Sequence, residues 1–110
     1  MILRERRGRA SPGNPDAYPD HFRENVAREL RSVAGFLGAS LFRQNRGDAV
    51  EYMVLTRWAS MNAIRAFAGE DVGKAVVEPG AIAALVDYDD RVQHYSLVQE
   101  VDPHDQDHAA

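Results

Sequence analysis

The chain has 110 residues, enough for one domain with one hydrophobic core. It contains no cysteine, so disulfides, thiolate nucleophiles and cysteine-ligated metal centres are excluded. The net charge of −4 argues against a nucleic-acid partner held by phosphate neutralisation. The N-terminus is charged from Arg4 onward, and no run of about 18 apolar residues occurs. We therefore expect no signal peptide and no membrane partner, and the cytoplasm is the expected compartment.

The first elements are predicted to be a strand and an amphipathic helix. Residues 2–10 are short, charged and alternating, and the run Ser11–Pro15 ends them in a turn. The apolar residues that follow recur every three or four positions, which predicts one helical stripe: Tyr18, Phe22, Val26, Leu30 and Val33. Pro19 belongs in the first turn of this helix, and Gly35 is a natural terminator.

Two strands, 36–45 and 49–58, flank a glycine-containing turn at 46–48. The second strand is apolar on both faces, because Met53 and Leu55 alternate with Tyr52, Val54 and Trp58. A sheet with helices on one side should have a polar opposite face. A second subunit must therefore cover the other face, so we expect a homodimer. Tyr52 and Trp58 are predicted on, or next to, the covered face.

The second half is predicted to contain a longer helical region and a last strand. Ser60 is a candidate cap for a helix with Met61, Ile64 and Phe67 on one side, ended by Gly69. Residues 71–77 and 80–86 are predicted as short helical turns, 87–90 as a polar connection and 91–101 as the last strand. The domain thus spans residues 1–101, and 102–110 form an acidic tail that is expected to be disordered. The fold class is α+β, with a ferredoxin-like β-α-β-β-α-β order.

The segment from Tyr52 to Phe67 joins an apolar strand, a tryptophan, a small polar cap and an amphipathic helix. Together with 66–71, 74–79 and 91–95, it resembles the antibiotic biosynthesis monooxygenase family over residues 2–100. The resemblance implies a dimeric α+β barrel in which two sheets face each other. It also implies a pocket between each sheet and its helices. The family combines oxygenases and haem degraders on one scaffold, so the fold alone does not name the reaction.

The haem-degrading branch has an asparagine on the first strand, a tryptophan in the second helical region and a histidine one short helix later. This chain has no asparagine on its first strand, Phe67 at the tryptophan position and Val77 near the histidine position. The resemblance therefore favours the cofactor-independent oxygenases, which act on polycyclic phenols or quinols. No cofactor is expected.

Under this hypothesis His94 is the candidate base, because the ordinary pKa of histidine lies near neutrality. Trp58 is a candidate pocket wall and Asn62 a polar catalytic candidate. The candidate substrate-binding residues are Tyr52, Phe67, Phe42 and Arg57. Structural alternatives remain: a hydrogen-bonded His94 within the sheet, a Trp58 that packs in the core or interface, and a solvated Asn62. Tyr95 has the opposite parity to His94, so the two must face opposite sides of the sheet.

Two charged groups have alternative interpretations. The first strand carries Arg4, Arg6, Arg7 and Arg9. Either all four form a solvated edge, or one of them faces the pocket and binds an anionic substrate. The tail carries His104, His108, Asp105 and Asp107, which have metal-ligand chemistry. Because ordering a tail costs conformational entropy, we expect these residues to be solvated and predict no metal site.

Two functional hypotheses follow. The first is a monooxygenase-like enzyme that acts on a small aromatic or quinone-type molecule. The second is a non-catalytic dimeric ligand-binding or stress-response protein on the same scaffold. A His94 buried against a closed pocket of ~300 Å³ or more would favour the enzyme. An arginine-lined pocket without a water-excluded base would favour the binding protein.

Overall fold

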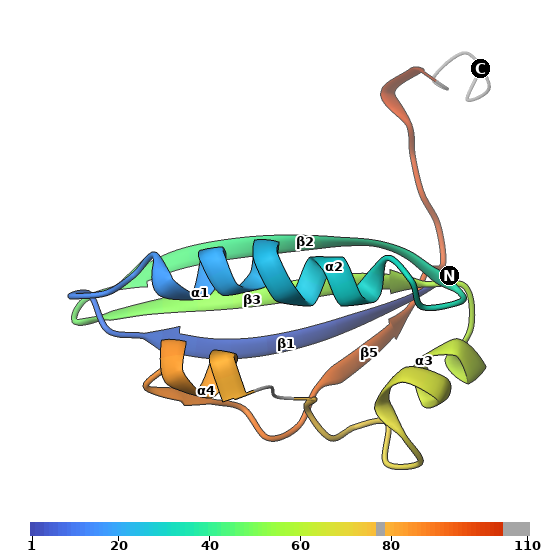
Figure 1. The fold of residues 1–110 in the computed structure, drawn as a ribbon. Helices are drawn as coiled ribbons and strands as arrows, with labels where there is room; N and C mark the ends of the chain where they lie inside the picture. Colours follow the sequence, from blue (N-terminus) through green and yellow to red (C-terminus); the bar gives the residue numbers. More distant parts are fainter. Residues whose placement is uncertain (77–78, 105–110) are drawn as a thin grey trace.

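The computed structural model describes residues 1–76 and 79–104. One antiparallel sheet contains β1 (Ile2–Ala10), β2 (Phe36–Arg46), β3 (Ala49–Trp58), β4 (Asp87–Tyr88) and β5 (Gln93–Ser96). The order is β2-β3-β1-β4, and β5 also pairs with β1 (Figure 1). Since β4 and β5 pair with opposite ends of β1, they act as one interrupted edge strand. The predicted α+β, ferredoxin-like order is confirmed.

The helices are short. The helix α1 (Ala17–His21), the π-helical turn η1 (Phe22–Val26) and α2 (Ala27–Leu30) follow one another without a break. This confirms the first predicted helix, although it ends at Leu30. The helix α3 (Met61–Ala68) is capped as predicted, because the Ser60 hydroxyl accepts from the Ala63 N–H at 3.1 Å. The helix α4 (Pro79–Ala84) comes last.

Within residues 1–76 and 79–104, no helix has the length and apolar character needed to cross a membrane.

The hairpin between β2 and β3 fixes the register of the sheet. Its turn needs a left-handed residue, and Gly47 supplies it with φ +58°. From this turn the strands pair up to Phe36 and Trp58, with one irregularity between Phe36 and Gly38. The register places Arg4 and Arg6 of β1 beside Thr56 and Val54 of β3. These four residues therefore share one face of the sheet.

The alternate residues of β3 lie in different environments. Tyr52, Val54, Thr56 and Trp58 are buried beneath the helices, while the residues between them are half-buried. The prediction that Tyr52 and Trp58 lie towards a partner is therefore wrong, because both side chains pack against helices of their own chain. Both sets of alternate residues are largely apolar, so the sequence could not determine which set faces the helices.

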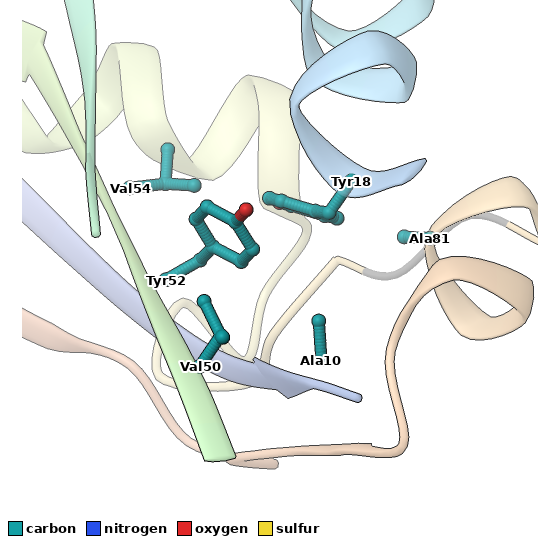
Figure 2. Close-up of a cluster of buried hydrophobic side chains, with 6 residues drawn as sticks. All are labelled: Ala10, Tyr18, Val50, Tyr52, Val54 and Ala81. Atoms are coloured by element: carbon teal, nitrogen blue, oxygen red, sulfur yellow. The ribbon is translucent and has the colours of Figure 1, made fainter. Parts of the chain in front are cut away.

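Two apolar clusters join the helices to the sheet. The first surrounds Tyr52 and contains Ala10, Tyr18, Val50, Val54 and Ala81 (Figure 2). In it the rings of Tyr18 and Tyr52 lie 5.5 Å apart. The second cluster contains Leu30, Ile64 and a fully buried Trp58. The Trp58 ring lies 5.3 Å from the ring of Phe67, so the second cluster connects β3 to α3.

Three predicted elements are wrong. The polar connection predicted over 87–90 contains the strand β4, which pairs with β1. Residues 71–76 were predicted as part of a helical turn but contain a turn and an isolated bridge from Lys74 to Arg91. They form no helix because Arg4 and Arg6 donate hydrogen bonds to every second carbonyl of this segment. Val77 lies outside the described residues. The last strand was predicted over 91–101, yet β5 ends at Ser96. Beyond Ser96, the Leu97 N–H donates to the Met1 carbonyl at 2.9 Å, and residues 97–102 form no strand.

The chain after β5 leaves the sheet and extends away from the body of the domain (Figure 1). Val98 and Val101 on this segment are 92% and 81% exposed. Residues 105–110 lie outside the described residues, so the disordered tail stays a prediction there.

Candidate functional site

Three small cavities lie between the sheet and the helices. The first holds about 30 Å³. Its lining residues are Arg4, Arg6, Val26, Leu30, Val54, Thr56, Phe67 and Val76. The other two hold about 20 Å³ and about 10 Å³, and Arg6 borders all three cavities. We call this region the sheet–helix site. Its walls are mostly apolar, with arginines from β1 and, in the cavity of about 20 Å³, His21 and Glu29 as further polar residues.

The sheet–helix site is closed in this structure, because such volumes hold only one or a few water molecules. A ring-sized ligand needs a cavity of about 300 Å³ or more, so side chains must move to admit one. A larger hollow of about 510 Å³ lies among Lys74, Ile82, Tyr88 and Arg91. Its side chains are mostly exposed, so it cannot exclude water as the sheet–helix site does.

Arg4 is the most buried charged residue among those described, at 5% exposed. Its Nη1 donates to the Val72 carbonyl at 2.5 Å, and its Nη2 donates to the Lys74 carbonyl at 3.0 Å. Burial, with a smaller contribution from the charge of Arg6, lowers the pKa of Arg4 to about 10. The guanidinium therefore remains protonated at neutral pH, at a cost in desolvation.

His94 lies beside Arg4 on the helix-covered face, with Nε2 3.0 Å from Arg4 Nη1. A guanidinium can only donate, so Nε2 accepts and the imidazole proton is on Nδ1. Burial lowers the pKa of His94 below its ordinary value, and the charge of Arg4 lowers it further. His94 is therefore neutral at pH 7, but Arg4 occupies its Nε2 lone pair. Tyr95 points to the opposite face as predicted, where its hydroxyl lies 3.3 Å from Glu5.

Arg6 is the second arginine in the site. It donates to the Val76 carbonyl and to the Tyr18 hydroxyl. Among the described residues, neither Arg4 nor Arg6 forms an ion pair with a carboxylate. The sequence had indicated a pocket-facing arginine without saying which one. The signal that identifies both is their shared parity, which places them with the buried residues of β3.

Three of the predicted site residues lie in or behind this region. Phe67 lines the cavities of about 30 Å³ and about 20 Å³, and Tyr52 lines the cavity of about 10 Å³. Trp58 lines none of the three cavities but packs against Phe67, and its Nε1 donates to the Thr56 hydroxyl at 2.8 Å. His94 lines none of the three cavities and is joined to the site through Arg4, which lines the first.

The other predicted site residues lie elsewhere. Asn62 is exposed on α3, where its Oδ1 accepts from Arg65 at 2.9 Å. Phe42 is 48% exposed on the helix-free face of β2. Arg57 also lies on that face, and its Nη1 donates to the Ser40 hydroxyl at 3.2 Å. The structure does not bring these three residues to the sheet–helix site.

Solved structures similar to this one share its fold. One is the haem-degrader MhuD from Mycobacterium tuberculosis, solved with two haems bound in its active site. It is 19% identical with a TM-score of 0.61, and the match covers 93% of this chain and 100% of that one. SnoaB, a cofactor-independent oxygenase from Streptomyces nogalater, is 19% identical with a TM-score of 0.58. The match covers 91% of this chain and 96% of that one. A putative antibiotic biosynthesis monooxygenase from Bacillus cereus is 15% identical with a TM-score of 0.62, covering 91% and 97%.

A comparison with curated proteins finds no match. The model of one protein family, described as antibiotic biosynthesis monooxygenase, matches residues 1–79. This match covers β1 to α3 and includes both arginines of the sheet–helix site. The chain therefore belongs to the antibiotic biosynthesis monooxygenase family.

Proposed function

We propose that this protein is a cofactor-independent, monooxygenase-like enzyme that acts on a small aromatic or quinone-type molecule in the sheet–helix site. The observation that carries the proposal is the small, mostly apolar space lined by Arg4, whose guanidinium contacts His94 of β5 behind the cavity wall. Such a space keeps out bulk water and supplies a few polar groups that can orient a ligand. The fold shared with the oxygenase SnoaB supports the proposal, and the cytoplasm remains the expected compartment.

The reaction needs an electron-rich substrate, because molecular oxygen reacts more readily with a phenolate or quinolate than with the neutral compound. Neutral His94 can accept the hydroxyl proton at Nε2 once the substrate hydroxyl replaces Arg4 there. The Arg4 guanidinium can then stabilise the oxyanion that forms. Phe67 serves as the aromatic wall, and Trp58 holds it from behind.

Haem does not fit the described residues. Haem iron is held by histidine, cysteine, methionine or tyrosine, and a histidine needs an available ring nitrogen to act as the ligand. His94 accepts from Arg4 through Nε2, and His21, which lines a neighbouring cavity, has Nδ1 within 3.1 Å of the Asn25 amide and further interactions. The resemblance to the haem-degrading branch also implies a tryptophan at the position of Phe67. We therefore derive no step through haem.

We also propose that the protein is a homodimer formed through the helix-free face of the sheet. In the described part of the chain no helix covers this face. Apolar residues from each of four strands lie on it: Leu3, Phe42, Met53, Leu55 and Tyr95. The extended segment after β5 exposes Val98 and Val101, which a second copy would cover. Burial of this apolar surface is the driving force for association.

Oxygen uptake tests the proposed activity. Wild-type protein should consume oxygen with a panel of polycyclic phenols and quinols faster than they autoxidise, and His94→Ala should lower the rate about 100-fold or more. Because the pKa of His94 lies below its ordinary value of 6.5, the base is already neutral at that pH. The rate should therefore fall only when the pH drops below about 6.5. No uptake above autoxidation, or an unchanged rate in His94→Ala, would rule out this mechanism.

The second candidate function is a non-catalytic, ligand-binding dimer. The bond from Arg4 to His94 favours it, because a base whose lone pair is occupied cannot take a substrate proton. Binding of the phenols without oxygen uptake would select this candidate.

A further inference from the structure

The arginines on the two faces of β1 differ in whether they pair with carboxylates. On the helix-free face Arg7 pairs with Glu5 and Glu51, at 2.7 Å and 2.9 Å, and Arg9 donates to Asp89 at 2.7 Å. On the helix-covered face Arg4 and Arg6 have only neutral partners among the described residues. Arg4 is buried and Arg6 half-buried, so the most buried charge among the described residues is an uncompensated one.

This arrangement is costly if it serves only the fold. A buried charge without a counter-charge is strongly disfavoured, and two like charges two residues apart on one face also repel each other. The lowered pKa of Arg4 reflects both effects. An apolar residue at position 4 or 6 would avoid this cost. Among the described residues, Glu29 borders the cavity of about 20 Å³ together with Arg6 but forms no ion pair with it, so the arginines remain open to an external anion.

The guanidiniums also have donors to spare. In residues 1–76 and 79–104, the Nε–H of Arg4 and that of Arg6 have no hydrogen-bond partner. Their terminal nitrogens hold the carbonyls of Val72, Lys74 and Val76, which are neutral acceptors. A carboxylate accepts two parallel bonds from a guanidinium and binds more strongly than a neutral carbonyl. It can therefore replace these carbonyls.

We propose that Arg4 and Arg6 form a carboxylate-binding site and that the ligand of the sheet–helix site is an aromatic acid. The carboxylate lies between the two guanidiniums, and its ring system packs against Phe67, Leu30 and Val54. Arg6 borders all three cavities, so a movement of its side chain would enlarge the space available to the ring system. The inference rests on the proposed function only for the location of the ligand.

Calorimetric titration without oxygen tests this site independently of turnover. The probes are 2-naphthoate, its neutral analogue 2-naphthamide, and acetate, which carries the charge without the ring. We expect the wild type to bind naphthoate at least about ten-fold more tightly than naphthamide, and acetate far more weakly than naphthoate. Equal binding of acid and amide, including no binding of either, would overturn the proposal. So would acetate binding as tightly as naphthoate.

Arg6→Met should bring the preference for the acid close to one while leaving naphthamide binding within about three-fold. The matched control is Arg28→Gln, which removes an exposed arginine from α2 and should keep the full preference. If Arg6→Met does not fold, Arg6→Lys keeps the charge without the planar fork and should lower the preference at least about three-fold. An unchanged preference in the folded Arg6 variant would overturn the proposal.

Failure of the proposed function looks different. Acid-selective binding without oxygen uptake would leave this site in place and remove the oxygenase activity. Oxygen uptake with neutral quinols, without any preference for acids, would leave the activity in place and overturn the carboxylate site.

Discussion

Trp58→Ala is expected to lower the free energy of unfolding by about 3–5 kcal/mol, most of the stability of a domain this small. Trp58 is 0% exposed and packs against the rings of Phe36 and Phe67 at 5.5 Å and 5.3 Å. Its removal leaves a cavity between β3 and α3 and also leaves the buried Thr56 hydroxyl without its donor. Urea unfolding followed by circular dichroism measures the loss.

Two further variants separate packing from surface effects. Trp58→Phe keeps an aromatic ring but loses the indole N–H, so it should cost clearly less than Trp58→Ala. Asn62→Ala alters an exposed side chain on α3 and should change stability by less than about 0.5 kcal/mol. A Trp58→Ala loss as small as that of Asn62→Ala would contradict the assignment of Trp58 to the core.

Leu55→Asp is expected to weaken the proposed dimer by about 100-fold or more while leaving the monomer folded. Leu55 is half-buried on the helix-free face, beside Glu5 and Ser40 on the neighbouring strands. An aspartate there would bury a charge in the interface and would also repel Glu5. Sedimentation velocity at micromolar concentration measures the association, and circular dichroism verifies the fold.

The matched control for this experiment is Ile82→Asp. Ile82 is 52% exposed on α4, away from the sheet, so the same charge change should leave association intact. A wild-type protein that is monomeric at micromolar concentration, or a Leu55→Asp variant that associates normally, would contradict a dimer through the helix-free face.

The order of strands and helices was predictable because local signals define it. The turn glycine Gly47, the cap residue Ser60 and the apolar stripe from Tyr18 to Leu30 all form the elements that their patterns indicate. These signals depend on neighbours in sequence. The short β5 was not predictable, because it depends on pairing with β1, some 90 residues earlier in the chain.

The site was less predictable because it depends on which face the helices cover. Both sets of alternate β3 residues are largely apolar, which hid the direction of Tyr52 and Trp58. The same ambiguity hid which arginines of β1 face the helices. Only the register with β3 shows that Arg4 and Arg6 lie on the helix-covered face and Arg7 on the other. His94 was found by its chemistry, yet its bond to Arg4 joins residues 90 positions apart and leaves no local signal.

A crystal structure grown with 2-naphthoate would test most directly the central claim that one face of the sheet binds a ligand and the other a partner. We predict naphthoate between Arg6 and Phe67 on the helix-covered face. We also predict two copies in contact through the residues around Leu55. Naphthoate bound on the helix-free face, or helices packed against that face from the same chain, would contradict the account.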